Sequence, residues 1–128
     1  MNVLIDTHAL LWIAGDEKQV SARAKGVFLN PRNELYFSIA NLWEMAIKIS
    51  IKKLNLGSTL DDFVDDHIVG NGIRLLPIKP SHVVRVATVP FIHRDPFDRL
   101  MIAQAMVENM RILSSDGRLD GYSVRRIW

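Results

Sequence analysis

The chain lacks cysteine, long apolar runs and a glycine-rich turn, and each absence excludes a class of protein. With no cysteine among 128 residues, disulfide bonds, thiolate catalysis and zinc–cysteine sites are excluded. The longest unbroken apolar run, from Ala9 to Ala14, is far too short to span a membrane. No glycine-rich turn follows the first apolar segment, which argues against a dinucleotide-binding domain.

The histidines are not spaced as metal ligands, and the net charge is small. The four histidines include no two at a spacing typical of a metal site. A net charge of +2, 48% hydrophobic residues and 23% charged residues are typical of a soluble globular protein. No positively charged leader precedes the apolar segment 3–5, so we expect a cytoplasmic protein without a membrane anchor. The length fits one domain, residues 1–128.

Strand-like and helix-like segments alternate along the chain. Continuous apolar segments predict parallel strands, because both faces of such a strand are buried, and apolar residues three or four apart predict helices. The predicted strands are residues 2–6, 34–37, 73–76, 111–115 and 123–127. The predicted helices are residues 7–14, 21–29, 38–54, a segment that begins after Thr59, 81–87 and 96–110. This alternation predicts a three-layer α/β/α sandwich around a mainly parallel sheet.

Four acidic residues lie where a predicted strand passes into a helix or loop. Asp6 closes the first strand and Glu44 lies early in the helix after the second, while Asp98 opens the last long helix and Asp116 follows the next strand. The carboxyl ends of parallel strands meet at one edge of the sheet, where ligand crevices form. Carboxylates gathered there repel by about 4 kcal/mol per pair at ~4 Å, and Mg²⁺ or Mn²⁺ would neutralise them. The pattern predicts a metal-dependent phosphodiesterase.

Local structure offers an alternative role for each of these acids. Asp6 could cap the following helix, and Asp116 precedes Gly117 in a dipeptide typical of a turn. Glu44 could pair with Lys48 one helical turn later, a contact that contributes only about 0.2–0.5 kcal/mol. Their shared position at strand ends favours a common site over four separate local roles.

Helix starts account for further acids. Asp95 fits an N-cap and Asp98 the third helical position, so that capping alone could explain both. A second group of acids lies opposite the apolar face of the helix after Thr59: Asp61, Asp62, Asp65 and Asp66. We interpret this group as a solvated outer face near a helix N-terminus, where negative charge is favourable.

Four segments of the chain resemble PIN-domain proteins of the VapC toxin type. They are Asp6–Trp12 (DTHALLW), Leu42–Lys48 (LWEMAIK), His93–Leu100 (HRDPFDRL) and Leu113–Asp116 (LSSD). The third segment, followed by Ile102–Ala105 (IAQA), is the most specific, and the four stand in the family's order and spacing. The resemblance implies a PIN-like fold, a homodimer and an Mg²⁺- or Mn²⁺-dependent endoribonuclease. It also implies that the protein is the toxin of a toxin–antitoxin pair, held inactive by a cognate antitoxin.

The resemblance assigns the family's acidic quartet to Asp6, Glu44, Asp98 and Asp116. It implies that Asp6 and Asp98 are the central metal ligands. Glu44 and Asp116 would bind the metal directly, bind it through water, or hold a second metal. The family often has threonine two residues before the last acid, where this chain has Ser114. We expect the Ser114 hydroxyl to orient a ligand or a bound water.

Basic residues could form a rim that attracts phosphates: Lys48, Lys52, Lys53, Arg94, Arg99, Arg118, Arg125 and Arg126. The alternative for each is an ordinary solvated side chain. Within this set, Lys48, Arg94 and Arg99 are the predicted contacts to the RNA backbone. His8 lies directly beyond Asp6 and is a predicted substrate contact.

Two rival functions use the same residues. A phosphatase with Asp6 as covalent nucleophile would usually have a second aspartate two residues on, where this chain has His8. A domain of the same fold that binds RNA or protein without cutting would be favoured by the loss of an acid, and all four are present.

Overall fold

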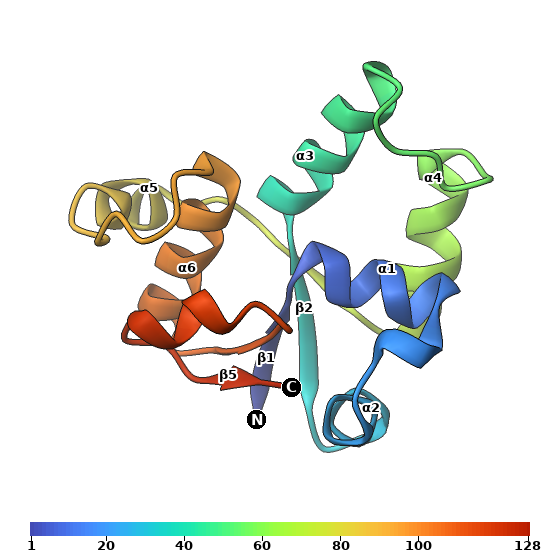
Figure 1. Ribbon diagram of the computed structural model, residues 1–128, viewed down its shortest axis with the longest axis horizontal. Helices are drawn as coiled ribbons and strands as arrows, with labels where there is room; N and C mark the ends of the chain where they lie inside the picture. The colour runs from blue at the N-terminus through green and yellow to red at the C-terminus, as the bar shows by residue number, and fades with distance from the viewer.

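A five-stranded parallel sheet lies between two layers of helices in the computed structural model, which describes residues 1–128 (Figure 1). The strand order is β3-β2-β1-β4-β5, and every neighbouring pair is parallel. The strands are β1 (Asn2–Ile5), β2 (Glu34–Ser38), β3 (Arg74–Leu76), β4 (Arg111–Leu113) and β5 (Arg126–Ile127). The predicted three-layer α/β/α sandwich is confirmed.

The helices follow the predicted order with changed ends. The α-helices are α1 (Thr7–Gly15), α2 (Ala22–Leu29), α3 (Ile39–Ser50), α4 (Leu60–Phe63), α5 (Pro80–Val86) and α6 (Pro96–Glu108). Short turns of other helical types are η1 (Glu17–Gln19), η2 (Val64–Ile68), η3 (Val69–Asn71) and η4 (Gly117–Gly121). The helix predicted to reach residue 54 ends at Ser50, because Lys52 adopts a left-handed conformation with φ of 60°.

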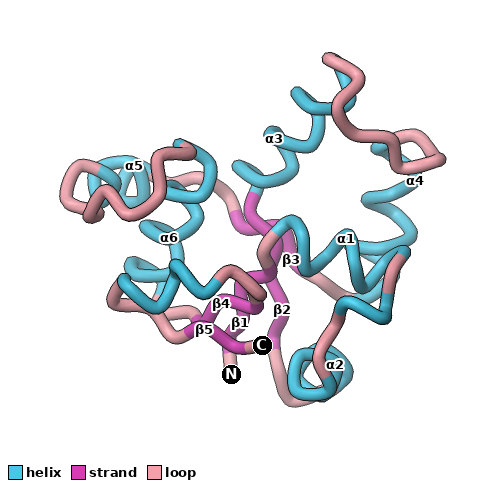
Figure 2. Tube along the Cα trace, in the orientation of Figure 1, coloured by secondary structure: helices cyan, strands magenta, loops and turns pink.

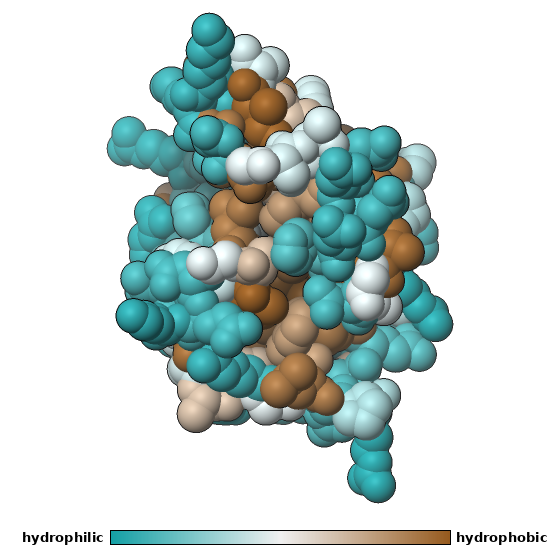
Figure 3. Space-filling view, turned by 90° about the vertical axis from the view of Figure 1, so that its right-hand side faces the viewer, coloured by the Kyte–Doolittle hydropathy of each residue, from teal (hydrophilic) through white to brown (hydrophobic).

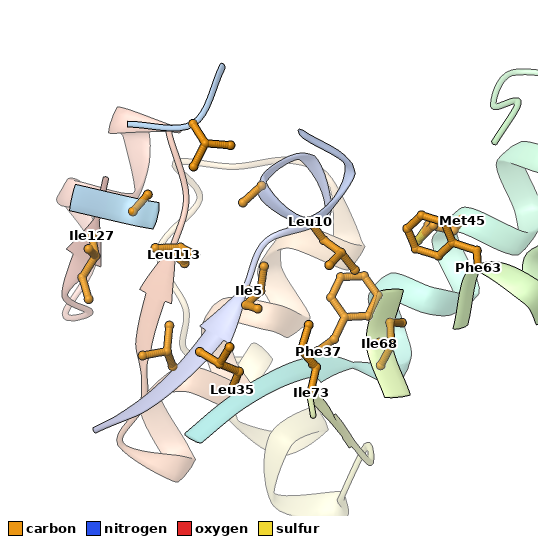
Figure 4. Packing of buried hydrophobic residues seen from close by; sticks show 14 residues of the cluster. Ile5, Leu10, Leu35, Phe37, Met45, Phe63, Ile68, Ile73, Leu113 and Ile127 are labelled. Carbon is orange, nitrogen blue, oxygen red and sulfur yellow. The ribbon is translucent and has the colours of Figure 1, made fainter. Parts of the chain in front are cut away.

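The two faces of the sheet bury different side chains. Val3 and Ile5 of β1 belong to a core beneath α1, α2, α4 and η2, whereas Leu4 belongs to a core beneath α6 and η4. This alternation follows from the twofold side-chain period of a strand. Figure 2 shows α5 and α6 on one side of the strands and α1, α2 and α4 on the other. In Figure 4, Phe37 of β2 lies close to Leu10 of α1 in the first core.

The connections leave β1 and β4 toward opposite faces of the sheet. After β1 the chain passes through α1 and α2 on one face, and after β4 it passes through η4 on the other. Such a divergence between neighbouring parallel strands opens a crevice at their carboxyl ends. No helix has the length and apolar character needed to cross a membrane.

Candidate active site

A crevice of about 430 Å³ lies at the carboxyl ends of β1 and β4. All four predicted acids line it: Asp6, Glu44, Asp98 and Asp116. They come from the segments that follow two strands, from the second turn of α3 and from the first turn of α6, so that segments up to 110 positions apart meet here. The structure therefore brings together the residues that the strand-end pattern had grouped.

Asp6 is held where β1 ends. Its main-chain N–H donates to the Leu113 carbonyl at 3.0 Å, which ties the start of the β1–α1 turn to β4. Its carboxylate makes no capping hydrogen bond to α1. Instead, Oδ2 accepts a hydrogen bond of 2.7 Å from the Ser114 hydroxyl. Asp6 therefore stands at the N-cap position of α1, but its carboxylate does not cap the helix and is directed to Ser114.

Ser114 links two of the acids. Its side chain is fully buried, and its Oγ both donates to Asp6 and accepts from the Asp116 main-chain N–H at 3.0 Å. One hydroxyl thus orients the Asp6 carboxylate and fixes the backbone that carries Asp116. This position agrees with the predicted orienting role of Ser114.

Glu44 has a loose local partner, and the Asp98 carboxylate has none. Lys48 Nζ lies 3.7 Å from Glu44 Oε2, a loose ion pair with a half-exposed lysine. The N-cap of α6 is Asp95, which accepts from the N–H groups of Phe97 and Asp98 at 2.8 and 3.1 Å. Asp98 itself makes no side-chain hydrogen bond and faces the crevice. Capping thus explains Asp95 and not Asp98.

Asp116 has hydrogen-bond partners on two sides. On the exposed side, Arg118 binds it bidentately, with Nε and Nη2 at 3.0 and 2.9 Å from the two carboxylate oxygens. The Arg118 main-chain N–H also donates to Oδ1, so the predicted turn at Asp116 is present. On the buried side, His93 Nε2 lies 2.8 Å from Oδ2. The turn and a place in the crevice are compatible for this acid.

Burial raises the pKa of three of the four acids, and their mutual repulsion adds to it. The pKa of Asp98 rises to about 6, chiefly through burial and then through the charges of Asp95, Asp6 and Glu44. Burial likewise raises the pKa of Asp6 and of Glu44 above their ordinary values. By contrast, hydrogen bonds led by Arg118 hold the pKa of Asp116 well below its usual range. A cation bound in the crevice would therefore stabilise the ionised form of these three carboxylates.

Comparison with known proteins identifies the fold and the family. Residues 3–124 match the PIN domain family. The chain belongs to the PIN domain family. A chain in the structure of VapBC2 from Rickettsia felis, solved with a DNA fragment from its promoter, is similar in fold with a TM-score of 0.72 and 15% identity. A chain in VapBC-1 from nontypeable Haemophilus influenzae gives 0.62 and 13%. Each match covers 98% of this chain and 96% or more of the other. Comparison with curated protein sequences gave no significant match.

The donor set of this PIN domain suits a hard divalent cation. Carboxylate oxygens line the crevice, and no thiol or paired imidazole competes with them. As the side chains lie in the structure, no three of these groups are arranged to hold a metal ion together. Arg118 occupies both carboxylate oxygens of Asp116, whereas Ser114 and His93 each bond one oxygen of their acid. Binding would therefore require side-chain rotation within the crevice and the release of Arg118.

The structure places three of the four predicted substrate contacts at the crevice or on the surface and buries the fourth. His8 and Lys48 line the crevice, and Arg94 is exposed in the loop before α6. Arg99 is buried and donates to three main-chain carbonyls, those of Val86, Val89 and Pro90, at 2.8–3.2 Å. The prediction that Arg99 contacts RNA does not agree with this placement. Its guanidinium holds the loop between α5 and α6, because a planar fork of donors can satisfy several carbonyls at once.

Two features of the site were missed from the sequence. His93 and Tyr122 form a buried hydrogen-bonded pair behind Asp116, 29 positions apart in the chain. Arg118 was included among eight rim residues without its pairing to Asp116. The only sequence feature that could have indicated His93 is its place in the specific segment His93–Leu100. The four exposed acids of the α4–η2 segment stay outside the site, as interpreted: Asp61, Asp62, Asp65 and Asp66.

Proposed function

We propose that this PIN domain is a Mg²⁺- or Mn²⁺-dependent endoribonuclease and the toxin of a toxin–antitoxin pair in the cytoplasm. The observation that carries the proposal is the crevice in which four acids from distant segments meet, three of them with a raised pKa. A bound divalent cation would offset their repulsion. Family membership and the fold shared with two VapBC structures support the same activity.

The residues of the crevice have distinct parts in the proposed reaction. A bound cation would supply charge that stabilises the developing phosphate charge and would acidify the attacking water. Asp6 and Asp98 would be its central ligands, with Glu44 and Asp116 completing the set. Ser114 keeps the Asp6 carboxylate in place through its 2.7 Å hydrogen bond. No protein nucleophile is needed.

RNA would be bound at the margin of the crevice by basic side chains and by aromatic rings. Lys48 is half-exposed on one side, and Arg118 is exposed on another. Both can reach phosphate oxygens without leaving a charge buried. His8 is exposed and lines the crevice, and its ring lies 6.0 Å from that of Trp12. These aromatic rings could stack on an unpaired base.

Metal-dependent cleavage of RNA is the first expected result. The purified chain is incubated with total RNA and with a panel of tRNAs, in Mg²⁺, in Mn²⁺ and in chelator. Cleavage is expected in one or both metals and should be absent in chelator, because the acids alone cannot stabilise the developing charge. Equal cleavage in chelator, or none with any RNA in either metal, would contradict the proposal. Binding of RNA without cleavage would favour the non-cutting domain.

A cognate antitoxin is the proposed protein partner. Apolar side chains gather in a band between polar ones on the face of α1, α2 and α4 (Figure 3). The acidic crevice would attract an arginine or lysine of the partner. Expression of the chain should arrest growth, and co-expression of the neighbouring gene's product should relieve the arrest. If the chain is harmless and does not bind that product, the toxin assignment fails while the nuclease assignment stands.

A homodimer is proposed as the active assembly. Three apolar side chains recur at four-residue spacing along α3 and its C-cap and are exposed: Trp43 by 58%, Ile47 by 37% and Ile51 by 55%. Such a stripe is costly to leave in water and suits an interface with a second copy. Sedimentation of the purified chain should give the mass of a dimer, and a monomer at all accessible concentrations would contradict this part of the proposal.

A further inference from the structure

A buried chain of hydrogen bonds lies behind Asp116 and has no part in the reaction described above. It runs from the Tyr122 hydroxyl to His93 and from His93 Nε2 to Asp116 Oδ2, the last step spanning 2.8 Å. Only 2% of His93 and 6% of Tyr122 are exposed. His93 does not line the crevice, so it cannot touch a substrate there. Its one hydrogen bond to the site is to the Asp116 carboxylate.

The hydrogen-bond network assigns the imidazole proton. The His93 main-chain N–H donates to the Tyr122 oxygen at 2.7 Å, which makes that oxygen an acceptor. The phenolic hydrogen is then free to donate to His93 Nδ1, 3.2 Å away. Nδ1 is therefore the acceptor of the ring, and a neutral imidazole carries its hydrogen on Nε2. That hydrogen is donated to Asp116.

The two partners of Asp116 differ in their exposure to solvent. Arg118 binds it bidentately, but the Arg118 side chain is 65% exposed, so that water and bound cations can compete for this pair. His93 is enclosed, and Tyr122 fixes its ring from behind. When Arg118 leaves, His93 still sets the direction of the carboxylate. Hydrogen bonds of this kind orient metal-binding side chains in many proteins.

We propose that His93 is a positioning residue. Held by Tyr122, it donates its Nε2 hydrogen to Asp116 and keeps that carboxylate directed into the crevice after Arg118 is displaced. This role rests on the proposed function, since it concerns the loading of a divalent cation by the acidic cluster. His93 itself contacts no substrate in this role.

The test compares two buried histidines of the same chain. His82 is fully buried, and its Nε2 lies 2.8 Å from Glu108 Oε1, a pair of the same geometry that lies outside the crevice. His93→Phe and His82→Phe each remove one buried imidazole–carboxylate bond, so both should lower the melting temperature. Mn²⁺ affinity is measured by calorimetry on each folded variant. His93→Phe should bind Mn²⁺ roughly 10–100-fold more weakly than wild type, and His82→Phe should bind it as wild type does.

Two milder variants keep the test decisive if His93→Phe does not fold. His93→Gln places an amide N–H near the position of Nε2 and should recover most of the Mn²⁺ affinity. Tyr122→Phe frees the ring of His93 and should weaken Mn²⁺ binding while the histidine stays in place. In the metal-free wild type, nitrogen NMR should show the His93 hydrogen on Nε2.

Three outcomes would overturn the positioning role. The first is an unchanged Mn²⁺ affinity in both His93→Phe and Tyr122→Phe. The second is a loss of Mn²⁺ affinity in His82→Phe equal to that in His93→Phe. The third is an imidazole hydrogen on Nδ1 of His93 in the metal-free protein. Failure of the wild-type chain to bind Mn²⁺ would overturn the proposed function instead, and this role with it. Direct measurement on the wild type therefore separates the two failures.

Discussion

Replacement of Asp98 by asparagine should abolish RNA cleavage and, in the absence of metal, make the protein more stable. The opposite signs follow from one cause. Asp98 carries its charge in a buried, acid-rich crevice, which raises its pKa to about 6. Asparagine keeps the size of the side chain without the charge. Cleavage should fall by at least about a thousandfold, because a central carboxylate of the proposed metal site is lost.

The gain in stability should depend on pH. Because the pKa of Asp98 is higher in the folded state than in the unfolded state, ionisation of this group opposes folding. Its destabilising effect is absent below about pH 4, develops between about pH 4 and 6, and is complete above that. Asp98→Asn should therefore match wild type near pH 4 and exceed it at pH 7. The difference should be on the order of 1–2 kcal/mol after allowance for solvent screening, or roughly 3–10 °C in melting temperature.

Asp62→Asn is the matched control for a role at the start of a helix. Asp62 is the third residue of α4 as Asp98 is of α6, and its N–H likewise bonds the N-cap side chain, that of Thr59. It is exposed and lies outside the crevice. Loss of its charge should lower stability by about 0.3–1 kcal/mol through the helix dipole. If Asp98→Asn behaves like Asp62→Asn and keeps its activity, Asp98 belongs to the helix start alone.

Metal provides a second readout on the same variants. Wild type at a metal concentration 100 times the dissociation constant should gain about 2.7 kcal/mol of stability. Asp62→Asn should show the full gain, and Asp98→Asn should lose most of it. A variant that melts below wild type, gains normally from Mg²⁺ and still cleaves RNA would exclude Asp98 from the metal ligands.

The four acids could be predicted from the sequence because the strand and helix ends on which they lie have local sequence signals. Asp6 follows three fully buried apolar residues, and a parallel strand with two buried faces is readable as a continuous apolar segment. Once the strands were placed, the meeting of their carboxyl ends followed from the topology of a parallel sheet. Glu44 and Asp98 were then placed by their helices, of which one begins directly after a strand and the other at a proline. None of these steps required knowledge of side-chain contacts.

The role of Arg99 could not be predicted from local sequence features. Its charge and its place beside Asp98 suggested an exposed residue on the rim of the crevice. Its actual surroundings are main-chain carbonyls of the segment 86–90 and the ring of Phe91, whose centre lies 3.9 Å from the guanidinium carbon. That segment has no periodic pattern, so its path cannot be read from the sequence. Long-range contacts of loops decide the role of this arginine.

The ends of elements were also set by contacts that periodicity does not carry. The apolar spacing of α3 continues to Leu54, yet the helix stops at Ser50 because Lys52 turns into a left-handed conformation. The predicted last strand, residues 123–127, forms ladder pairs only at Arg126 and Ile127. At the end of α3 the main-chain N–H groups of Lys53 and Leu54 turn back to the Lys48 carbonyl, a local arrangement that the apolar spacing does not indicate.

Removal of the Ser114 hydroxyl should have the second largest effect on activity. Ser114→Ala leaves one Asp6 oxygen and the Asp116 N–H without their shared partner in a buried place. The free energy of unfolding should fall by about 1–3 kcal/mol. Cleavage per folded molecule should fall roughly 10–100-fold, because the hydroxyl orients a central carboxylate. Ser114→Thr keeps a hydroxyl at this position and should retain most of the activity.

The pH dependence separates orientation from simple loss of stability. The hydrogen bond from Ser114 lowers the pKa of Asp6 against the larger effect of burial, so its removal should raise that pKa further. A cation must then compete with a proton over a wider range of pH. Ser114→Ala should therefore lose more Mn²⁺ affinity at pH 6 than at pH 8, as measured by calorimetry on folded protein. Equal losses at both pH values would mean that the hydroxyl acts on the geometry of Asp6 and not on its proton affinity. Unchanged affinity and cleavage would remove Ser114 from the site altogether.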